Sequence, residues 1–255
     1  MDPVMGDPVI GDVMDFMGHD FTPLTQGQIM ARLLAWPQGA SFAYLVTPNA
    51  DHLARLRRVP ALRVVYARAL YRLLDSRCLW HAATRLGLPA PPVVTGADLT
   101  HALLPHLAGR RVAVLGMRPS VIAALARHYP DITFLHHAPP MRLLYKRDAF
   151  FAAVSFAESA RTDFVFLALG APVQEMLAYA LARRRRACGF GLCVGAALEF
   201  ASGQRARAPL WMRKAGLEWM HRLLCEPHRL AGRYISALGY LLPSLLKAAI
   251  RQKWS

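Results

Sequence analysis

The stretch RVAVLGMRPS at residues 111–120 determines the fold class of this chain. Its first five residues are typical of a buried strand, Gly116 follows at once, and a helix is expected to start near Pro119. A buried strand that turns on a glycine into a helix is half of a βαβ unit. The same pattern returns in DFVFLALG at residues 163–170, which precedes another helical segment. Two such units indicate a parallel sheet.

Other short apolar runs continue this alternation. SFAYLV at residues 41–46, ITFL at 132–135 and the run from Cys188 to Val194, which ends at Gly195, are expected strands, and Val13 to Phe16 is expected to start the first one. We therefore expect an α/β fold, with a Rossmann-like, mainly parallel sheet and helices on both faces. The glycine fingerprint GxGxxG is absent from the sequence, which counts against a nucleotide-dependent oxidoreductase.

Helices are expected between these strands. Thr25 is a suitable N-cap for a helix through Ala35, and the residues TGADL from Thr95 predict a second capped helix. The apolar spacing from Ala61 to Leu74 predicts a third.

A cationic segment follows the last expected strand. Residues 203–234 carry seven Lys and Arg residues against two Glu, with Trp211 and Trp219 between them. The apolar run at 235–250 is interrupted by Pro243 and Lys247 and falls short of the ~20 residues of a comfortable membrane span, so an interfacial helix is expected. We expect residues 1–200 to form the core and 201–255 a helical, membrane-associating appendage, whose tryptophans, Trp254 included, lie at headgroup level. The alternative is a solvated basic face over an ordinary amphipathic helix.

The net charge of +15 indicates anionic partners. Nucleic acid, a membrane surface and phosphorylated substrates all fit this charge. A basic nucleic-acid-binding protein is therefore the alternative to an enzyme, although no helix-turn-helix, OB or RRM signature is present. The acidic first twenty residues lack the positive region of a secretory leader, and the four cysteines are scattered without a CxxC pair. These features predict reduced thiols, no metal site and a cytoplasmic protein.

Five polar residues stand where strands give way to helices. Thr47 and Asn49 follow one expected strand, Gln174 and Glu175 open the helix after another, and Asp75 follows the apolar run LYRLL. Ligands of open α/β sheets bind at the carboxyl ends of strands, so these residues are candidates for a site. Capping, a favourable charge near a helix dipole and a solvated charge are the ordinary alternatives.

The order of the motifs TPNADHL, DSRCLW, TGADL, VLGMRPS, LALGAPVQE and RAPLW…GLEWMHRLLCEPHRLAGRY resembles that of the bacterial WecG/TagA/CpsF glycosyltransferases, glycosyltransferase family 26, over residues 13–234. The resemblance implies inverting, metal-independent transfer, without a cofactor, of a hexose or N-acetylhexosamine from a nucleotide diphosphate sugar, expected to be a UDP-sugar. The implied acceptor is an undecaprenyl-diphosphate-linked saccharide in surface or exopolysaccharide synthesis. It also implies peripheral attachment to the inner face of the cytoplasmic membrane.

The resemblance also assigns roles. Asp75 matches the catalytic base, and Thr47 and Asn49 match the polar active-site motif. Gly170, Pro172, Gln174 and Glu175 match the signature of the donor side. Gly116 and Gly195, the glycine turns after two expected strands, are also expected to bind the donor. The acceptor diphosphate and the membrane are expected to meet Arg207, Arg222, Arg229 and Arg233. The sequence departs from the family pattern at Ser76, where a glycine is common, at PPVV before TGADL, and at His136-His137-Ala138.

Overall fold

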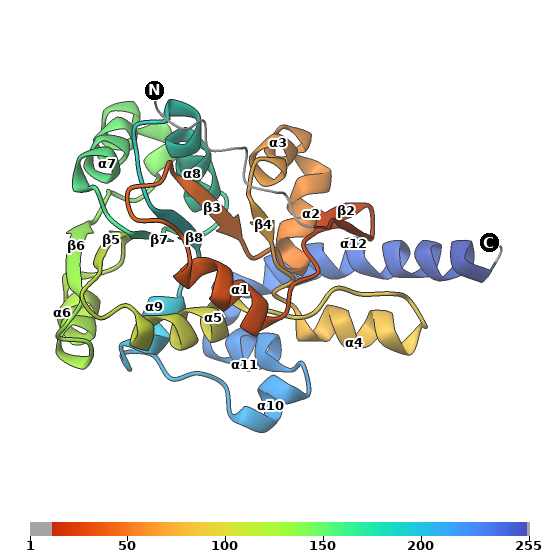
Figure 1. The fold of residues 1–255 in the computed structure, drawn as a ribbon. Helices are drawn as coiled ribbons and strands as arrows, with labels where there is room; N and C mark the ends of the chain where they lie inside the picture. Colours follow the sequence, from red (N-terminus) through yellow and green to blue (C-terminus); the bar gives the residue numbers. More distant parts are fainter. Residues whose placement is uncertain (1–11, 254–255) are drawn as a thin grey trace.

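A six-stranded, fully parallel sheet forms the centre of the computed structural model, which describes residues 12–253 (Figure 1). Its strand order is β4-β3-β8-β7-β5-β6. The strands are β3 (Ala43–Val46), β4 (Tyr71–Arg72), β5 (Arg111–Gly116), β6 (Thr133–His137), β7 (Phe164–Ala168) and β8 (Phe190–Cys193). The predicted parallel α/β sheet is confirmed.

Helices cover both faces of this sheet (Figure 1). One face packs against α2 (Ala50–Arg58), α3 (Arg63–Ala67), α7 (Arg147–Ala160) and α8 (Val173–Arg184). The other face packs against α1 (Gln26–Leu34), α5 (Gly96–Leu103), α6 (Pro119–His128) and α9 (Ala197–Ala201). Side chains alternate between the two cores, because successive residues of a strand point to opposite faces. In β5, Ala113 and Leu115 enter one core, while Val112 and Val114 enter the other.

The predicted first strand exists, but it lies outside the main sheet. β1 (Met14–Phe16) pairs antiparallel with β2 (His19–Phe21) in a separate hairpin. Phe16 and Phe21 are buried and meet edge to face, with ring centroids 5.8 Å apart. The hairpin is thus held by two aromatic side chains that enter the core.

The predicted helix from Ala61 to Leu74 is wrong after Ala67. A 3₁₀ turn, η1 (Pro60–Leu62), leads into the short α3, and the chain then becomes β4. The amides of Leu70 and Leu73 donate to carbonyls of β3, at 2.9 and 3.0 Å. Pairing with β3 therefore overrides the helical spacing, since a continuous apolar run fits a buried strand as well as a helix.

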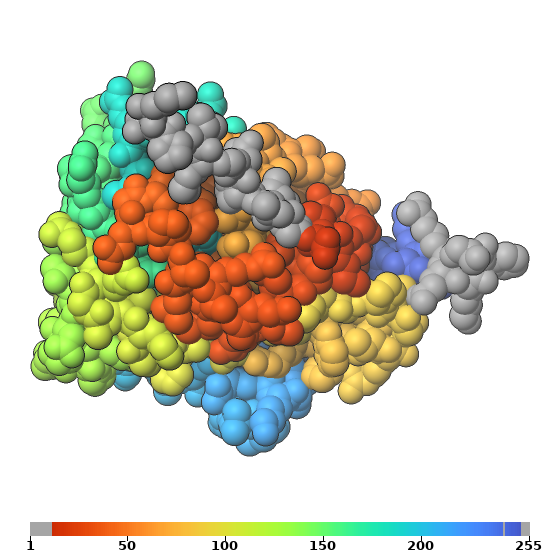
Figure 2. All heavy atoms as spheres, viewed as in Figure 1, coloured from red at the N-terminus to blue at the C-terminus, as the bar shows by residue number. Residues whose placement is uncertain are grey.

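The C-terminal part is a chain of helices. It comprises α10 (Leu210–Lys214), α11 (Glu218–Cys225) and α12 (Pro227–Lys253), and Pro227 starts the last helix as predicted. Leu230, Ala237 and Leu245 of α12 are buried, and the helix lies along α2. In Figure 2 it emerges from behind the N-terminal hairpin and α4 (Arg77–Arg85). Within residues 12–253, no helix is long and apolar enough to cross a membrane.

Candidate functional site

A cavity of about 540 Å³ lies at the carboxyl ends of five strands. Its wall includes Thr47 after β3, Asp75 after β4, Met117 after β5, Gly170 after β7 and Gly195 after β8. Residues of α11 and α12 close the other side. This is the edge at which open α/β sheets bind ligands.

Asp75 lines the cavity just beyond the edge strand. Its amide donates to the carbonyl of Pro48 at 3.0 Å, and its carboxylate accepts the Gly96 N–H at 3.2 Å. Burial raises the pKa of Asp75 to about 6, although Arg222 and the Gly96 amide act to lower it. Ser76, which replaces the glycine common in the family, has an extended backbone (φ −157°) and caps α4 by accepting the Leu79 N–H. No glycine is required at that position.

Thr47 and Asn49 each join the cavity wall to local structure. The Thr47 hydroxyl donates to the carbonyl of Cys193 at 3.2 Å and so ties the end of β3 to the end of β8. Asn49 caps α2, because its Oδ1 accepts the amides of Asp51 and His52 at 3.1 and 3.4 Å. The capping interpretation of Asn49 is therefore correct, and the residue lines the cavity as well.

Gln174 and Glu175 lie at different depths. Gln174 lines the cavity, but its carboxamide accepts the Gly195 N–H at 3.0 Å and donates to Glu175 at 2.9 Å. Glu175 is 2% exposed and sits behind the wall, where burial raises its pKa to about 6. His52 lies 3.8 Å from it, and burial lowers the pKa of His52 to about 4. Glu175 therefore supports the wall from behind, whereas His52 lines the cavity.

The predicted donor-binding glycines differ in whether they line the cavity. Gly170 and Gly195 line the cavity, whereas at the end of β5 the lining residue is Met117. Gly116 has φ +98°, and a Cβ there would lie 2.6 Å from the carbonyl oxygen of Ala168. Gly116 thus allows the ends of β5 and β7 to approach closely. Pro172 follows a cis peptide bond and precedes α8, and its neighbour Ala171 lines the cavity.

Seven arginines line the cavity, and six of them face a carboxylate. The seven are Arg77, Arg205, Arg207, Arg213, Arg222, Arg229 and Arg233. Arg222 is the exception: among the described residues it has no carboxylate partner, and its Nε is buried without a hydrogen bond. Its guanidinium lies over the ring of Phe200, 5.4 Å from the centroid. Arg222 is therefore the arginine most available to an anionic ligand.

Arg207 has a different environment. Its guanidinium donates to Asp98 of α5 at 2.6 Å and to Glu218 of α11 at 3.2 Å. Burial alone would raise the pKa of Asp98, but hydrogen bonds from Arg207 and Arg77 lower it to about 2. This geometry favours a clamp between core and appendage, in place of the ligand contact predicted for Arg207.

Arg233 and Arg229 hold carboxylates that each have a second partner. Arg233 donates to the buried Asp51 through Nε at 3.1 Å and Nη2 at 2.6 Å, and Arg55 donates to the same oxygen at 3.1 Å. Burial acts to raise the pKa of Asp51, yet the hydrogen bond from Arg233 lowers it overall. Arg229 similarly meets Glu226 at 2.5 Å, and Arg205 bonds that same carboxylate.

Aromatic side chains complete the wall, although the sequence predicted a headgroup position for Trp219 and assigned no role to Phe200 or Tyr234. Phe200, Trp219 and Tyr234 line the cavity, and the last two meet edge to face at 5.9 Å. Trp219 is therefore part of the cavity wall, not an outward headgroup anchor, whereas Trp211 is 64% exposed. Trp254 lies outside the described residues. The contact between Trp219 and Tyr234 could not be predicted from their sequence spacing, because it depends on how the chain bends between α11 and α12.

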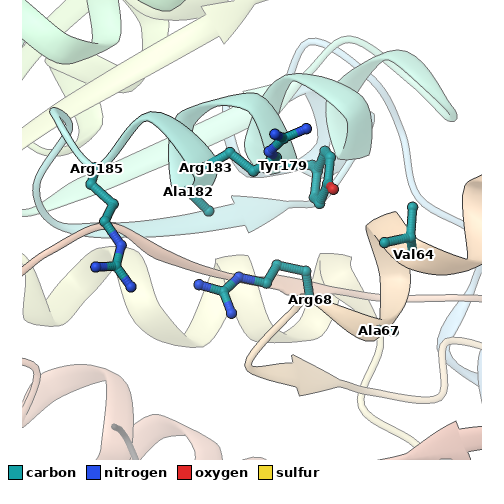
Figure 3. Close-up of a pocket in the computed structure, with 7 residues that line it drawn as sticks. All are labelled: Val64, Ala67, Arg68, Tyr179, Ala182, Arg183 and Arg185. Carbon is teal, nitrogen blue, oxygen red and sulfur yellow. The ribbon is translucent and has the colours of Figure 1, made fainter. Parts of the chain in front are cut away.

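A second hollow, of about 390 Å³, lies between α3 and the C-terminal end of α8. Figure 3 shows Arg68, Arg183 and Arg185 around it, with Arg183 5.7 Å from the ring centroid of Tyr179. None of the predicted site residues lines this hollow. Arginines at the end of α8 complement the negative end of the helix dipole, which also disfavours an anionic ligand there.

Metal ligands do not gather in groups of three or more His, Cys, Asp or Glu side chains anywhere in residues 12–253. Metal independence of the reaction stays a prediction.

The cavity at the carboxyl edge of this parallel α/β sheet is rich in arginine and aromatic side chains, and that edge is where open α/β proteins bind their ligands. The Glycosyl transferase WecG/TagA/CpsF family matches residues 14–255, so the chain belongs to this family, as the motifs predicted. Curated relatives include proteins of Staphylococcus aureus strains NCTC 8325 and COL, each 26% identical over 229 residues, or 85% of this chain and 86% of the relative. A protein of strain MRSA252 is 26% identical over 225 residues, with the same coverage. All three are N-acetylglucosaminyldiphosphoundecaprenol N-acetyl-beta-D-mannosaminyltransferases.

Proposed function

We propose that this chain transfers a hexose or N-acetylhexosamine from a UDP-sugar to a polyprenyl-diphosphate-linked saccharide, with inversion and without a metal. The product serves the synthesis of a bacterial surface polysaccharide or exopolysaccharide. Family membership supports sugar transfer, and the relatives' names support a lipid-diphosphate acceptor that carries N-acetylglucosamine. The observation that carries the proposal is the placement of Asp75 and the unpaired Arg222 in one cavity.

Asp75 acts as the general base. A pKa of about 6 leaves the carboxylate largely ionised at neutral pH, yet more basic than an ordinary aspartate. It accepts the proton of the acceptor hydroxyl while that oxygen attacks C1 of the donor sugar, and the nucleoside diphosphate leaves from the opposite face. A positioned base contributes typically ~10²–10⁴-fold to such a rate.

The leaving diphosphate is placed next to Gly170 and the start of α8. This twelve-residue helix begins after Pro172 without a side-chain cap, and Gly170 and Ala171, just before it, line the cavity. Amides at a helix N-terminus favour negative charge. Fixed donors of this kind stabilise charge that develops in the transition state.

The acceptor diphosphate binds first to Arg222, because that guanidinium has no carboxylate to release among the described residues. Arg229 and Arg233 then exchange Glu226 and Asp51 for phosphate oxygens. Arginine suits this role, since it binds phosphate through two parallel hydrogen bonds. The four predicted arginines thus divide into three ligand contacts and one clamp, Arg207.

The prenyl chain stays in the membrane, and the appendage lies at its surface. Five apolar side chains of α11 and α12 are each at least half exposed: Leu224, Ile235, Leu238, Leu246 and Ile250. An amphipathic helix that exposes such residues among cations is typical of an interfacial element. We place it on the inner face of the cytoplasmic membrane, and we keep residues 201–255 as the unit that makes this contact.

A donor and acceptor panel tests the proposal. Radiolabelled UDP- and GDP-sugars are incubated with prenyl-diphosphate-linked sugars, and lipid extraction measures transfer. We expect label in the lipid fraction with a UDP-sugar, inverted anomeric configuration by NMR, and full activity in excess chelator. Activity that requires added manganese or magnesium refutes metal independence. If no donor–acceptor pair reacts and the protein retains DNA on a filter at physiological salt, nucleic-acid binding replaces sugar transfer as the proposed function.

A further inference from the structure

The connection between β6 and α7 exposes an unusual group of apolar side chains. Met141 and Tyr145 are each 88% exposed, Phe151 is 43% exposed and Leu144 is 36% exposed. Single exposed apolar residues are common on protein surfaces, but contiguous ones mark an interaction site. These four lie within eleven residues of the chain, and we call the segment that carries them the β6–α7 patch.

This patch is held in a defined conformation. Leu143, which is 2% exposed, anchors the 3₁₀ turn η3 (Leu143–Tyr145) in the protein. The amides of Tyr145 and Lys146 donate to the carbonyls of Arg142 and Leu143, both at 3.0 Å. Met141 and Tyr145 therefore project from an ordered turn, so binding a partner costs little backbone entropy.

Cations alternate with these apolar residues along the chain. Arg142, Lys146 and Arg147 are exposed, and none of them makes an ion pair with any described residue. The Arg147 guanidinium lies 5.8 Å from the ring centroid of Phe151. The three cations outnumber the one exposed carboxylate of this segment, Asp148. Apolar and tyrosine side chains beside unpaired cations complement an anionic lipid surface, where the ring of a tyrosine sits at headgroup level.

The patch lies at the same edge of the sheet as the cavity. β6 runs parallel to β5, and His136 near its carboxyl end bonds the carbonyl of Gly116 at 2.9 Å. The next residue, Met117, lines the cavity. β6 forms one edge of the sheet and β4 the other. α12 packs on α2, which follows β3 next to β4, so the patch and α12 lie toward opposite edges of the sheet.

We propose that the β6–α7 patch, residues 141–147 with Phe151, is a second membrane contact for an anionic lipid surface. The appendage makes the first contact, and two separate contacts fix the orientation of the cavity relative to the bilayer. This inference rests on the proposed function, because a lipid-linked acceptor requires the cavity to face the membrane.

Vesicle flotation tests the patch without any substrate. The full chain is mixed with vesicles of equimolar phosphatidylcholine and phosphatidylglycerol, and the double variant Met141→Asp/Tyr145→Asp is compared with wild type. The matched control is Val64→Asp/Ala67→Asp, which adds the same charge at exposed positions on α3, beside the second hollow. We expect binding about tenfold weaker or more for the patch variant and nearly unchanged for the control. Arg142→Gln/Lys146→Gln should reduce the preference for anionic over neutral vesicles.

Equal flotation of the patch variant and wild type overturns the inference, as does an equal loss in the control. A light-scattering mass that halves in the patch variant also overturns it, since the patch is then an interface between copies of this chain. Transfer to a detergent-dispersed acceptor separates this inference from the proposed function. The patch variant should retain that transfer, whereas absence of transfer in wild type refutes the function and leaves the flotation result standing.

Discussion

The carboxylate of Asp75 is costly to bury, and its replacement should stabilise the protein while it removes activity. The pKa of Asp75 is raised from 3.8 to about 6, so the folded state binds its proton more tightly than the unfolded state does. The associated stability is present below pH 4 and is lost as the pH rises through 6. A rise of about two units corresponds to ~3 kcal/mol at pH 8. Asp75→Asn keeps the shape and removes the charge.

The measurement is urea unfolding of wild type and Asp75→Asn between pH 8 and pH 4. We expect the variant to be more stable by up to ~3 kcal/mol at pH 8, with the difference shrinking toward zero near pH 4. Sugar transfer by the variant should fall by ~10²–10⁴-fold. In wild type, kcat/KM should decline below about pH 6, as the base of the free enzyme becomes protonated.

Asp98 provides a control of opposite sign. Its pKa is lowered to about 2, so its stability is present above pH 4 and is lost only as the pH falls through 2. Asp98→Asn should therefore destabilise the fold by ~2 kcal/mol, with a constant loss between pH 8 and pH 5. If Asp75→Asn lowers stability at pH 8, or if its effect does not vary with pH, the burial argument for Asp75 is wrong. Near-wild-type turnover of the variant removes Asp75 from the mechanism.

Three further results are expected. Arg222→Gln should raise the KM for the prenyl-diphosphate acceptor by tenfold or more. Arg222→Lys should restore this KM only in part, because a single ammonium group cannot bind phosphate in a bidentate manner. Full rescue by lysine would contradict bidentate binding. Asp51→Asn should speed hydrogen exchange in α12. The loss of folding stability should be smaller than the ~3–5 kcal/mol of a fully buried ion pair, because Arg233 is 38% exposed. Unchanged exchange would show that apolar packing alone holds α12. Arg55→Gln should raise the acceptor KM although Arg55 does not line the cavity. Without Arg55, Asp51 depends on Arg233 alone, so Arg233 is less free to bind the acceptor phosphate. A lower KM would contradict this argument.

The sheet was predictable from sequence because its inner strands are buried on both faces. RVAVL, DFVFLAL and the run before Gly195 are continuous apolar segments that end on glycine, and each is a strand. The edge strand β4 has only two residues, so its pairing with β3 left no local signal. Asp75 was placed correctly in a pocket wall, yet the element before it is a strand and not the predicted helix.

The individual roles of site residues were less predictable, because they depend on partners far away in sequence. Nothing near Arg207 indicates that it meets Asp98, and nothing near Arg233 indicates Asp51. Gln174 precedes Glu175 in the chain, but only the fold shows that one lines the cavity and the other lies behind it. Local patterns thus located the carboxyl edge, whereas the division of its residues into cavity wall and support required the tertiary contacts.

Under the proposed function, the carboxylates of the cavity influence how a diphosphate enters it. Removing one partner of a buried ion pair costs ~3–5 kcal/mol when the remaining charge has no other partner. Asp51 keeps Arg55 when Arg233 leaves, and Glu226 keeps Arg205 when Arg229 leaves. Neither carboxylate is then stranded, so both arginines can exchange to phosphate at a smaller cost. A ligand that displaces both pairs has to interact with both arginines, so the proposal predicts that a doubly charged diphosphate binds better than a single carboxylate.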